Sequence, residues 1–255
     1  MNMKRGDVSA CRRGAWISAL AWSITVLAGP ATSVAAPITA VGGFDHYAGA
    51  AEQTTDGILA AVVLGAAGGD FTAAGVRFDD SEAGQGYSFT GGLGLPVAPM
   101  MMLRVIGTRF FGEQDLRAWR AKVGPQFSLP GGRTLTLSYS HYRNHLGARS
   151  NAGIAEATTP LVPRLSGRVG ASYARAPQGA PVLQGSVGLG WNVAPHFELT
   201  GEAGLLNSEG GAGAPGAPGG GLLGGLPLVG GGSGGSSAER LTYGTLSLGV
   251  RVTWP

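Results

Sequence analysis

Residues 138–145 form the one cluster in the sequence that suggests catalysis. They read Ser-Tyr-Ser-His-Tyr-Arg-Asn-His, so two hydroxyl groups and an imidazole lie within four residues of one another. A serine nucleophile needs a histidine base within hydrogen-bonding distance. Ser138 or Ser140 with His141 would supply both groups, and these three residues are the candidates for hydrolysis of an acyl ester.

The local conformation decides whether these candidates can meet. Residues 133–144 alternate polar and apolar side chains, with Leu135, Leu137 and Tyr139 on one parity, which predicts a β-strand. Successive side chains of a strand point to opposite faces, so His141 would face away from both serines. The pattern therefore favours an aromatic and imidazole belt at a membrane interface. Two histidines do not complete a metal site, and no metal is expected.

The same alternation recurs along the rest of the chain in segments of about ten residues, separated by turn residues. The segments begin near Ile38, Gly57, Phe71, Gly86, Met100, Leu116, Arg133, Ala152, Leu165, Val182, Phe197 and Arg240. The second, third and eighth segments are the least regular. The pattern predicts about twelve antiparallel strands, with ten as the fallback count.

Connections between these segments alternate in length. The short set includes Gly68-Gly69, Pro130 to Gly132 and Ala194-Pro195, and the long set includes Ala48 to Asp56, His145 to Asn151 and Ser208 to Glu239. The aromatic residues also divide between the two sets of strand ends. Near one set lie Tyr47, Tyr87, Phe110, Phe111, Trp119, Tyr139, Tyr142, Tyr173 and Tyr243, and near the other lie Phe127, Trp191, Phe197 and Trp254. Short turns on one side, longer loops on the other and two aromatic girdles are typical of a transmembrane up-and-down β-barrel.

The first 35 residues predict export. Lys4, Arg5, Arg12 and Arg13 precede an apolar run from Ala15 to Leu27, and the small residues Ser33 to Ala35 follow, which is the pattern of a cleaved secretory signal peptide. The segment contains the single cysteine and four of the 18 basic residues. Residues 36–255 are therefore the predicted barrel domain.

The composition supports a membrane location. Residues 36–255 carry 14 basic and 14 acidic side chains and no cysteine, so neither nucleic-acid binding nor disulfide or thiolate chemistry is expected. Only 13% of the whole chain is charged, against about 25% in soluble domains. The alternative is a secreted soluble β-sandwich or lipocalin-like barrel with its apolar face inward, which would usually carry more surface charge.

The closing stretch Tyr243 to Trp254 alternates apolar residues and ends in an aromatic residue, followed by Pro255. With the features above, it resembles the Gram-negative outer-membrane β-barrel proteins. The resemblance implies a location in the cell outer membrane, recognition of the closing strand by the barrel assembly machinery, and contact with outer-membrane lipid and lipopolysaccharide.

The predicted strand parity places a set of charged side chains in the lumen. The cations are Arg77, Arg104, Arg120, Lys122, Arg168 and Arg251, and the carboxylates are Asp45, Asp79, Glu198 and Glu202. Cations that line a constriction attract anions, so one interpretation is a mildly anion-favouring pore. The other is that the charges pair across the lumen and close it.

Residues 208–239 contain 14 glycines and predict a flexible outer loop. The functional prediction is a non-enzymatic barrel without a cofactor, serving as a narrow pore or in a structural or surface-interaction role. The alternatives are a lipid-modifying hydrolase that uses His141, and an export or assembly accessory that uses the glycine-rich loop.

Overall fold

The computed structural model describes residues 37–48, 54–66, 69–80, 84–113, 117–175, 181–209 and 240–254. The predicted signal peptide lies outside these residues. Of the predicted glycine-rich loop, Ser208 and Glu209 belong to a strand, and residues 210–239 lie outside the described part.

Twelve strands account for nearly all of the described residues. They are β1 (Ile38–Ala48), β2 (Thr54–Ala66), β3 (Gly69–Asp80), β4 (Gly84–Ala98), β5 (Met101–Gly112), β6 (Arg117–Leu129), β7 (Arg133–Asn144), β8 (Arg149–Val162), β9 (Leu165–Arg175), β10 (Val182–Ala194), β11 (Phe197–Glu209) and β12 (Arg240–Trp254). Each begins within three residues of its predicted start. The prediction of twelve strands is confirmed, and the fallback of ten is not needed.

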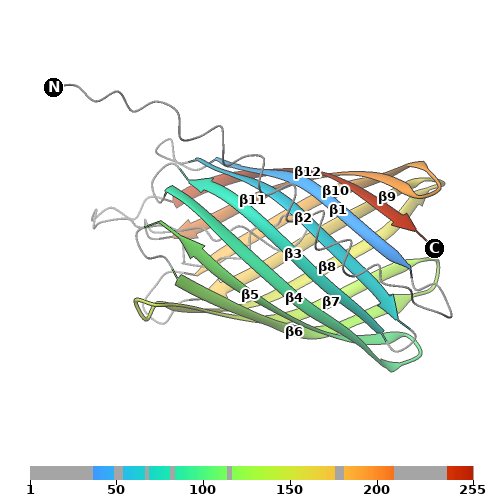
Figure 1. Ribbon diagram of the computed structural model, residues 1–255, viewed down its shortest axis with the longest axis horizontal. Helices are drawn as coiled ribbons and strands as arrows, with labels where there is room; N and C mark the ends of the chain where they lie inside the picture. Colours follow the sequence, from blue (N-terminus) through green and yellow to red (C-terminus); the bar gives the residue numbers. More distant parts are fainter. Residues whose placement is uncertain are drawn as a thin grey trace, which may run out of the picture. The chain divides into compact units, whose positions relative to one another are not determined.

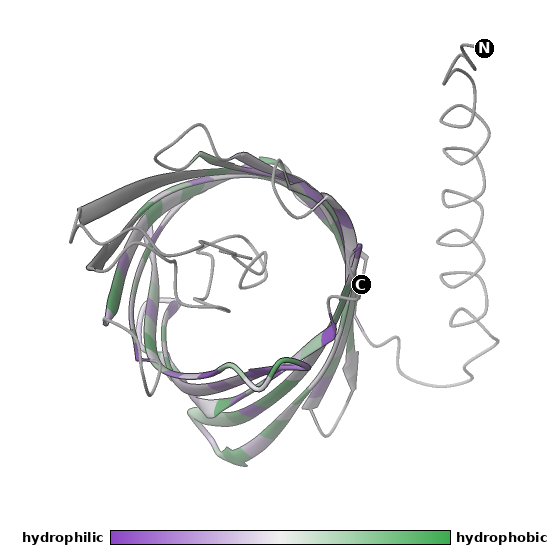
Figure 2. Ribbon diagram, turned by 90° about the vertical axis from the view of Figure 1, so that its left-hand side faces the viewer, coloured by the Kyte–Doolittle hydropathy of each residue, from purple (hydrophilic) through white to green (hydrophobic). Residues whose placement is uncertain are grey.

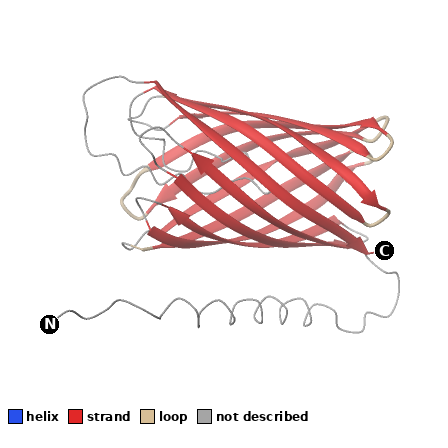
Figure 3. Ribbon diagram, turned by 90° about the horizontal axis from the view of Figure 1, so that it is seen from above, coloured by secondary structure: helices blue, strands red, loops and turns tan. Residues whose placement is uncertain are grey.

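Each strand pairs antiparallel with the next one in the sequence, and β1 pairs with β12 to close the barrel (Figure 1). The closing register joins Ile38 to Trp254 and Phe44 to Leu248. Closure satisfies the backbone of every strand by pairing and leaves no open edge. The strands run tilted across the barrel (Figure 3). Among the described residues there is no helix with the length and apolarity of a membrane span.

The ends of the barrel differ in their connections. At the end where β1 begins and β12 finishes, tight turns join the strands, and the β6–β7 turn places Gly131 and Gly132 at φ of 78° and 73°, a conformation that favours glycine. Bulges at Pro96 and Pro160 lie at the same end, where a residue without an N–H interrupts the ladder at little cost. The longer connections lie at the other end.

The two faces of the sheet have different side chains. Large apolar residues are exposed on one face, as shown by Ile58 at 65%, Val187 at 62% and Leu205 at 65% exposed. On the other face, side chains from strands two apart come into contact, as Asp70 of β3 and Arg104 of β5 do. Such side chains converge only on the concave face of a closed sheet, so that face is the interior. The colours along the ribbons alternate accordingly (Figure 2).

This arrangement contradicts the alternative of a soluble barrel with its apolar face inward. The inner face is nevertheless not uniformly polar, since Val41, Leu59 and Phe78 are buried on it.

Among the aromatic side chains that the structure describes, the predicted girdles are present with two exceptions. Trp119 and Tyr139 lie on the outer face toward the loop end, and Trp191 lies on it toward the turn end. Phe110 and Tyr142 were predicted to join the loop-end girdle, and that prediction is wrong. Both are buried on the inner face, with ring centroids 6.3 Å apart.

Candidate functional site: the inner wall

Strand register fixes which charged residues line the lumen. Eight of the ten residues predicted to do so lie on the inner face: Arg104, Arg120, Lys122, Arg168, Arg251, Asp45, Glu198 and Glu202. They come from six different strands, and together they form the inner wall.

Arg77 is one of the two exceptions. It pairs with the outward-facing Ile58, so the prediction that it lines the lumen is wrong. Its guanidinium donates a hydrogen bond to Gln85 Oε1 at 3.2 Å on the outer face, and Gln85 Nε2 lies 3.4 Å from Asp79 Oδ2. Asp79 is therefore also outside the lumen.

The parity error has a local cause. In β3 one face carries Phe71 and the other carries Val76 and Phe78, so hydrophobicity alone does not identify the lipid-facing side of this strand.

Two carboxylates on the inner wall were missed from the sequence, and the first is Asp70. Its Oδ2 lies 2.7 Å from Arg104 Nη2, and Arg104 Nε also donates to Gln126 Oε1. Asp70 and Arg104 stand in one row on either side of Gly94 in β4. A Cβ on Gly94 would lie 2.7 Å from Asp70 Oδ1. The glycine thus provides the space in which the two charges meet.

The same arrangement recurs on the opposite part of the barrel. Arg168 of β9 and Glu202 of β11 flank Gly188 of β10 in one row. Arg168 Nη1 lies 3.8 Å from Glu202 Oε2, and Glu202 is almost fully buried. A Cβ on Gly188 would lie 3.3 Å from that of Glu202. At two places on this wall, a glycine in the middle strand therefore lets oppositely charged side chains from the two flanking strands pair.

Two further pairs complete the set. Lys122 Nζ lies 3.2 Å from Oε2 of Glu156, the second missed carboxylate, and the pair spans β7. Arg251 Nη1 lies 2.8 Å from Glu198 Oε2 on the adjacent strand. Strand parity gave no clear signal for either carboxylate, because β3 carries apolar residues on both faces and the alanines beside Glu156 are small.

These contacts change both interpretations of the lumen charge. The inward-facing ionised residues with described side chains are five cations and five carboxylates, so the predicted excess of cations disappears. The four ion pairs join strands that are adjacent or two apart. They therefore run along the wall and do not bridge the lumen, contrary to the prediction that pairing closes it.

Arg120 is held differently. It is buried, and its guanidinium carbon lies 5.4 Å from the centroid of the Phe110 ring, which packs with Tyr142 and Ala118. The aromatic face attracts the cation and keeps the long side chain against the wall.

Several polar atoms of the inner face lack a protein partner. Asp70 Oδ1, Gln184 Nε2 and Thr200 Oγ1 are buried and have no hydrogen-bond partner among the described residues. Buried polar groups in folded proteins are almost always satisfied by protein or by water, and a water-filled lumen would supply the missing partners.

The candidate catalytic residues do not come together. His141 lies on the outer face, where its Nδ1 is 2.7 Å from Asn151 Oδ1. Ser138 and Ser140 lie on the inner face of the same strand. The opposite orientation expected from the alternation is confirmed, and no Ser–His hydrogen bond forms. Within the described residues, no three His, Cys, Asp or Glu side chains cluster as metal ligands would.

The fold is that of outer-membrane β-barrels. The solved KdgM porin has a TM-score of 0.56 and 10% sequence identity, and the similarity covers 84% of this chain and 99% of that one. The NanC porin gives 0.57 and 9%, covering 84% and 98%. The translocator domain of the autotransporter NalP from Neisseria meningitidis gives 0.50 and 11%, covering 95% and 97%.

At these identities the similarity concerns the fold, and at that level the resemblance predicted from the sequence is confirmed. No protein-family model matches the chain, and no curated protein matches it by sequence.

Proposed function

We propose that this chain resides in the outer membrane and forms a narrow, water-filled passage for small polar solutes, with little preference between anions and cations. The main support for this proposal is that four cation–carboxylate pairs lie along the inner wall and do not cross the lumen. A wall whose charges balance locally presents both signs to a passing solute without a net field, so it attracts neither ion strongly.

Three features support an aqueous lumen. Twelve strands give a barrel between the eight-stranded size, which side chains fill, and the sixteen-stranded size, which leaves a channel. Buried polar atoms of the inner face need water as their partner. KdgM and NanC, which share the fold, are porins by description, and KdgM has also been solved in complex with oligogalacturonate.

Planar-bilayer recording tests the proposal. The refolded protein should give discrete current steps, and its reversal potential in a KCl gradient should stay near zero, because the wall charges balance. The same recording on a chain with residues 210–239 replaced by a short turn controls for the long connection. Absence of current steps in both chains would refute a pore.

Export and assembly are the remaining parts of the proposal. If residues 1–35 are removed on export, protein extracted from membranes should begin at Ala36, and N-terminal sequencing tests this. β12 ends at Trp254 and closes the barrel against β1. This supports a role for Tyr243 to Trp254 in recognition by the assembly machinery, and truncation of that segment should abolish membrane insertion.

A further inference from the structure

Arginines gather on the outer face of β5–β9 at the loop end of the barrel. Arg109, Trp119, Arg143 and Arg149 stand in one continuous row across four strands. Neighbouring strands lie about 4.8 Å apart, so Arg143 and Arg149 are direct neighbours. Arg175 lies one row below, paired with Asn151. We call Arg109, Arg143, Arg149 and Arg175 the rim arginines.

No carboxylate faces outward on these five strands. The outward positions of Met101–Gly112, Arg117–Leu129, Arg133–Asn144, Arg149–Val162 and Leu165–Arg175 include no Asp or Glu. Glu113, in the turn after β5, lies against Gly84 of β4, away from the row. Like charges placed directly opposite on a sheet destabilise it. The row is thus a concentration of positive charge that the described protein leaves without a counter-ion.

The other side of the barrel shows that this is a local feature. On β1–β4, His46 Nδ1 lies 2.7 Å from Asp56 Oδ1, and Arg77 is linked through Gln85 to Asp79. There, each basic side chain at the same level has an acidic group nearby. Among the side chains that the structure describes, only the face of β5–β9 combines several arginines with no acid.

A fixed polar layer lies directly below the row. Asn151 Oδ1 accepts a hydrogen bond from the Tyr139 hydroxyl at 2.8 Å and lies 2.7 Å from His141 Nδ1. His141 also packs on Trp119, with ring centroids 5.2 Å apart. Because Oδ1 only accepts, His141 donates to it through Nδ1, and Nε2 is left to form a hydrogen bond with a ligand hydroxyl.

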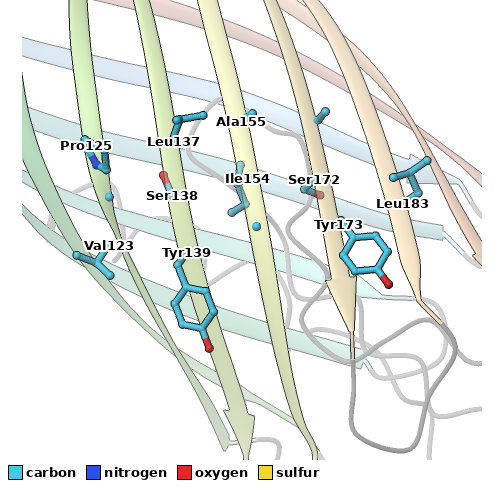
Figure 4. Close-up of a pocket in the computed structure, with 13 residues that line it drawn as sticks. Val123, Pro125, Leu137, Ser138, Tyr139, Ile154, Ala155, Ser172, Tyr173 and Leu183 are labelled. Atoms are coloured by element: carbon cyan, nitrogen blue, oxygen red, sulfur yellow. The ribbon is translucent and has the colours of Figure 1, made fainter.

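An apolar groove of about 550 Å³ continues from this layer toward the middle of the barrel (Figure 4). Its floor is Gly153, Ala155 and Ala171, and its sides include Leu137, Tyr139 and Tyr173. Tyr139 and Arg143 are four residues apart on β7, so the groove and the row are separated by about 13 Å. The surface thus has a cationic end, a hydrogen-bonding layer and an apolar channel in sequence.

We propose that this surface binds one phosphorylated, acylated glycolipid of the outer leaflet, of the lipid A type. Its phosphate groups lie on the rim arginines, its sugar hydroxyls on His141, and an acyl chain in the groove. The placement of the surface in the outer leaflet rests on the proposed membrane orientation. The solute passage through the lumen is a separate property.

Charge and spacing select this class of lipid. Arginine binds phosphate oxygens through paired N–H groups. Four arginines spread over five strands exceed what a single phosphodiester can neutralise, and they match a ligand with more than one phosphate. The groove below them fits a ligand that carries its own acyl chains.

Lipid retention by the full barrel, refolded in lipid-free detergent, tests the proposal by native mass spectrometry. The probes are bisphosphorylated lipid A, the same lipid without phosphates, and phosphatidylglycerol. We expect binding of the first only. The double variant Arg143→Gln/Arg149→Gln should bind it about 10- to 100-fold more weakly, the range for lost hydrogen bonds to charged groups. Arg133→Gln, on the outer face of the same strand at the turn end, is the matched control and should bind as the parent does.

A second pair of variants tests the groove without disturbing the fold. A Cβ on Gly153 meets no atom within 4 Å, so the side chain of Gly153→Leu begins in open space and extends into the groove. It should weaken binding, whereas Gly107→Leu, equally open and outside the groove, should not.

Equal binding by the parent and the double arginine variant would overturn the site. Equal binding of phosphatidylglycerol and lipid A would overturn its assignment to the glycolipid. Conductance recorded on the same double variant should be unchanged. If the parent barrel gives no current steps, the pore proposal is refuted, and the lipid-binding result remains valid because it is measured independently.

Discussion

Cations on the inner wall and cations on the rim have different surroundings. Arg104, Lys122, Arg168 and Arg251 each have a carboxylate oxygen within 4 Å. The rim arginines have no ion pair with the described residues, and Arg109 instead lies 5.6 Å from the Phe111 ring centroid. Both sets are in strands and both are partly accessible, so secondary structure does not explain the difference.

The difference comes from what lies between the charged strands. At two of the four inner-wall pairs, a glycine on the middle strand leaves room for a carboxylate and a guanidinium to meet across it. At the rim, the residue between Arg109 and Arg143 is Trp119, and no acid is present. The inner wall therefore balances its own charges, whereas the described residues give the rim arginines no carboxylate.

Gly94→Leu should have the largest effect. The new side chain would start 2.6 Å from Met102 Sδ and 2.7 Å from Asp70 Oδ1, so it would separate Asp70 from Arg104 as well as overpack the wall. We expect the free energy of unfolding to fall by about 3 kcal/mol or more, measured by tryptophan fluorescence in guanidinium with the protein in lipid vesicles. Gly91→Leu, on the outer face of the same strand with nothing within 4 Å, should change little. A matching loss in both would show that glycine content, and not the ion pair, matters here.

Asp70→Asn removes the charge and keeps the shape. Arg104 would then be left near Gln126 without its carboxylate, and we expect a loss of about 2 kcal/mol, the usual value for a hydrogen bond between charged groups. Asp79→Asn, on the exposed outer face, should lie within about 0.5 kcal/mol of the parent. The same unfolding measurement applies. Equal losses at the two sites would show that carboxylates on the inner wall stabilise the barrel no more than those on the outer face.

Neutralising two carboxylates of the inner wall should make the pore selective for anions. In Glu198→Gln/Glu202→Gln, Arg251 and Arg168 lose their partners, and the lumen gains two net positive charges. A unit charge about 10 Å from a permeating ion changes the energy of that ion by roughly 1.7 kcal/mol at an effective dielectric constant near 20. The chloride-to-potassium permeability ratio should therefore rise on the order of tenfold, read from the reversal potential. Arg168→Gln should shift it in the opposite direction, and a shift of the same sign in both would contradict a wall-charge origin.

The fold followed from the sequence because alternation over whole strands averages out local exceptions. Leu183, Val187 and Trp191 share one parity in β10, and that face is exposed as expected. Single charged residues were harder to place where both parities carried apolar residues, as around Arg77. Glu156 was missed for the opposite reason, because its neighbours Ala155 and Ala157 are too small to mark a lipid-facing side.

Pairing and clustering could not be predicted, because they depend on register between strands. Asp70 and Arg104 are 34 residues apart, and only the rows through Gly94 bring them together. The rim arginines are likewise spread from Arg109 to Arg175. Their one sequence signal is that Arg143 shares parity with Leu137 and Tyr139, which places a cation on the apolar face of a strand next to its end.

The smallest effect is expected at the rim, and its sign is the informative part. Arg149→Gln removes one of two like charges that stand directly opposite each other, so in lipid-free detergent it should stabilise the barrel by about 0.5 kcal/mol. Lipid A stabilises the folded state in proportion to its affinity, so in its presence the order should reverse, with the parent the more stable. Thermal unfolding of both proteins with and without the lipid measures this. If Arg149→Gln is the more stable protein in both conditions, the rim arginines repel one another without a bound phosphate to offset them.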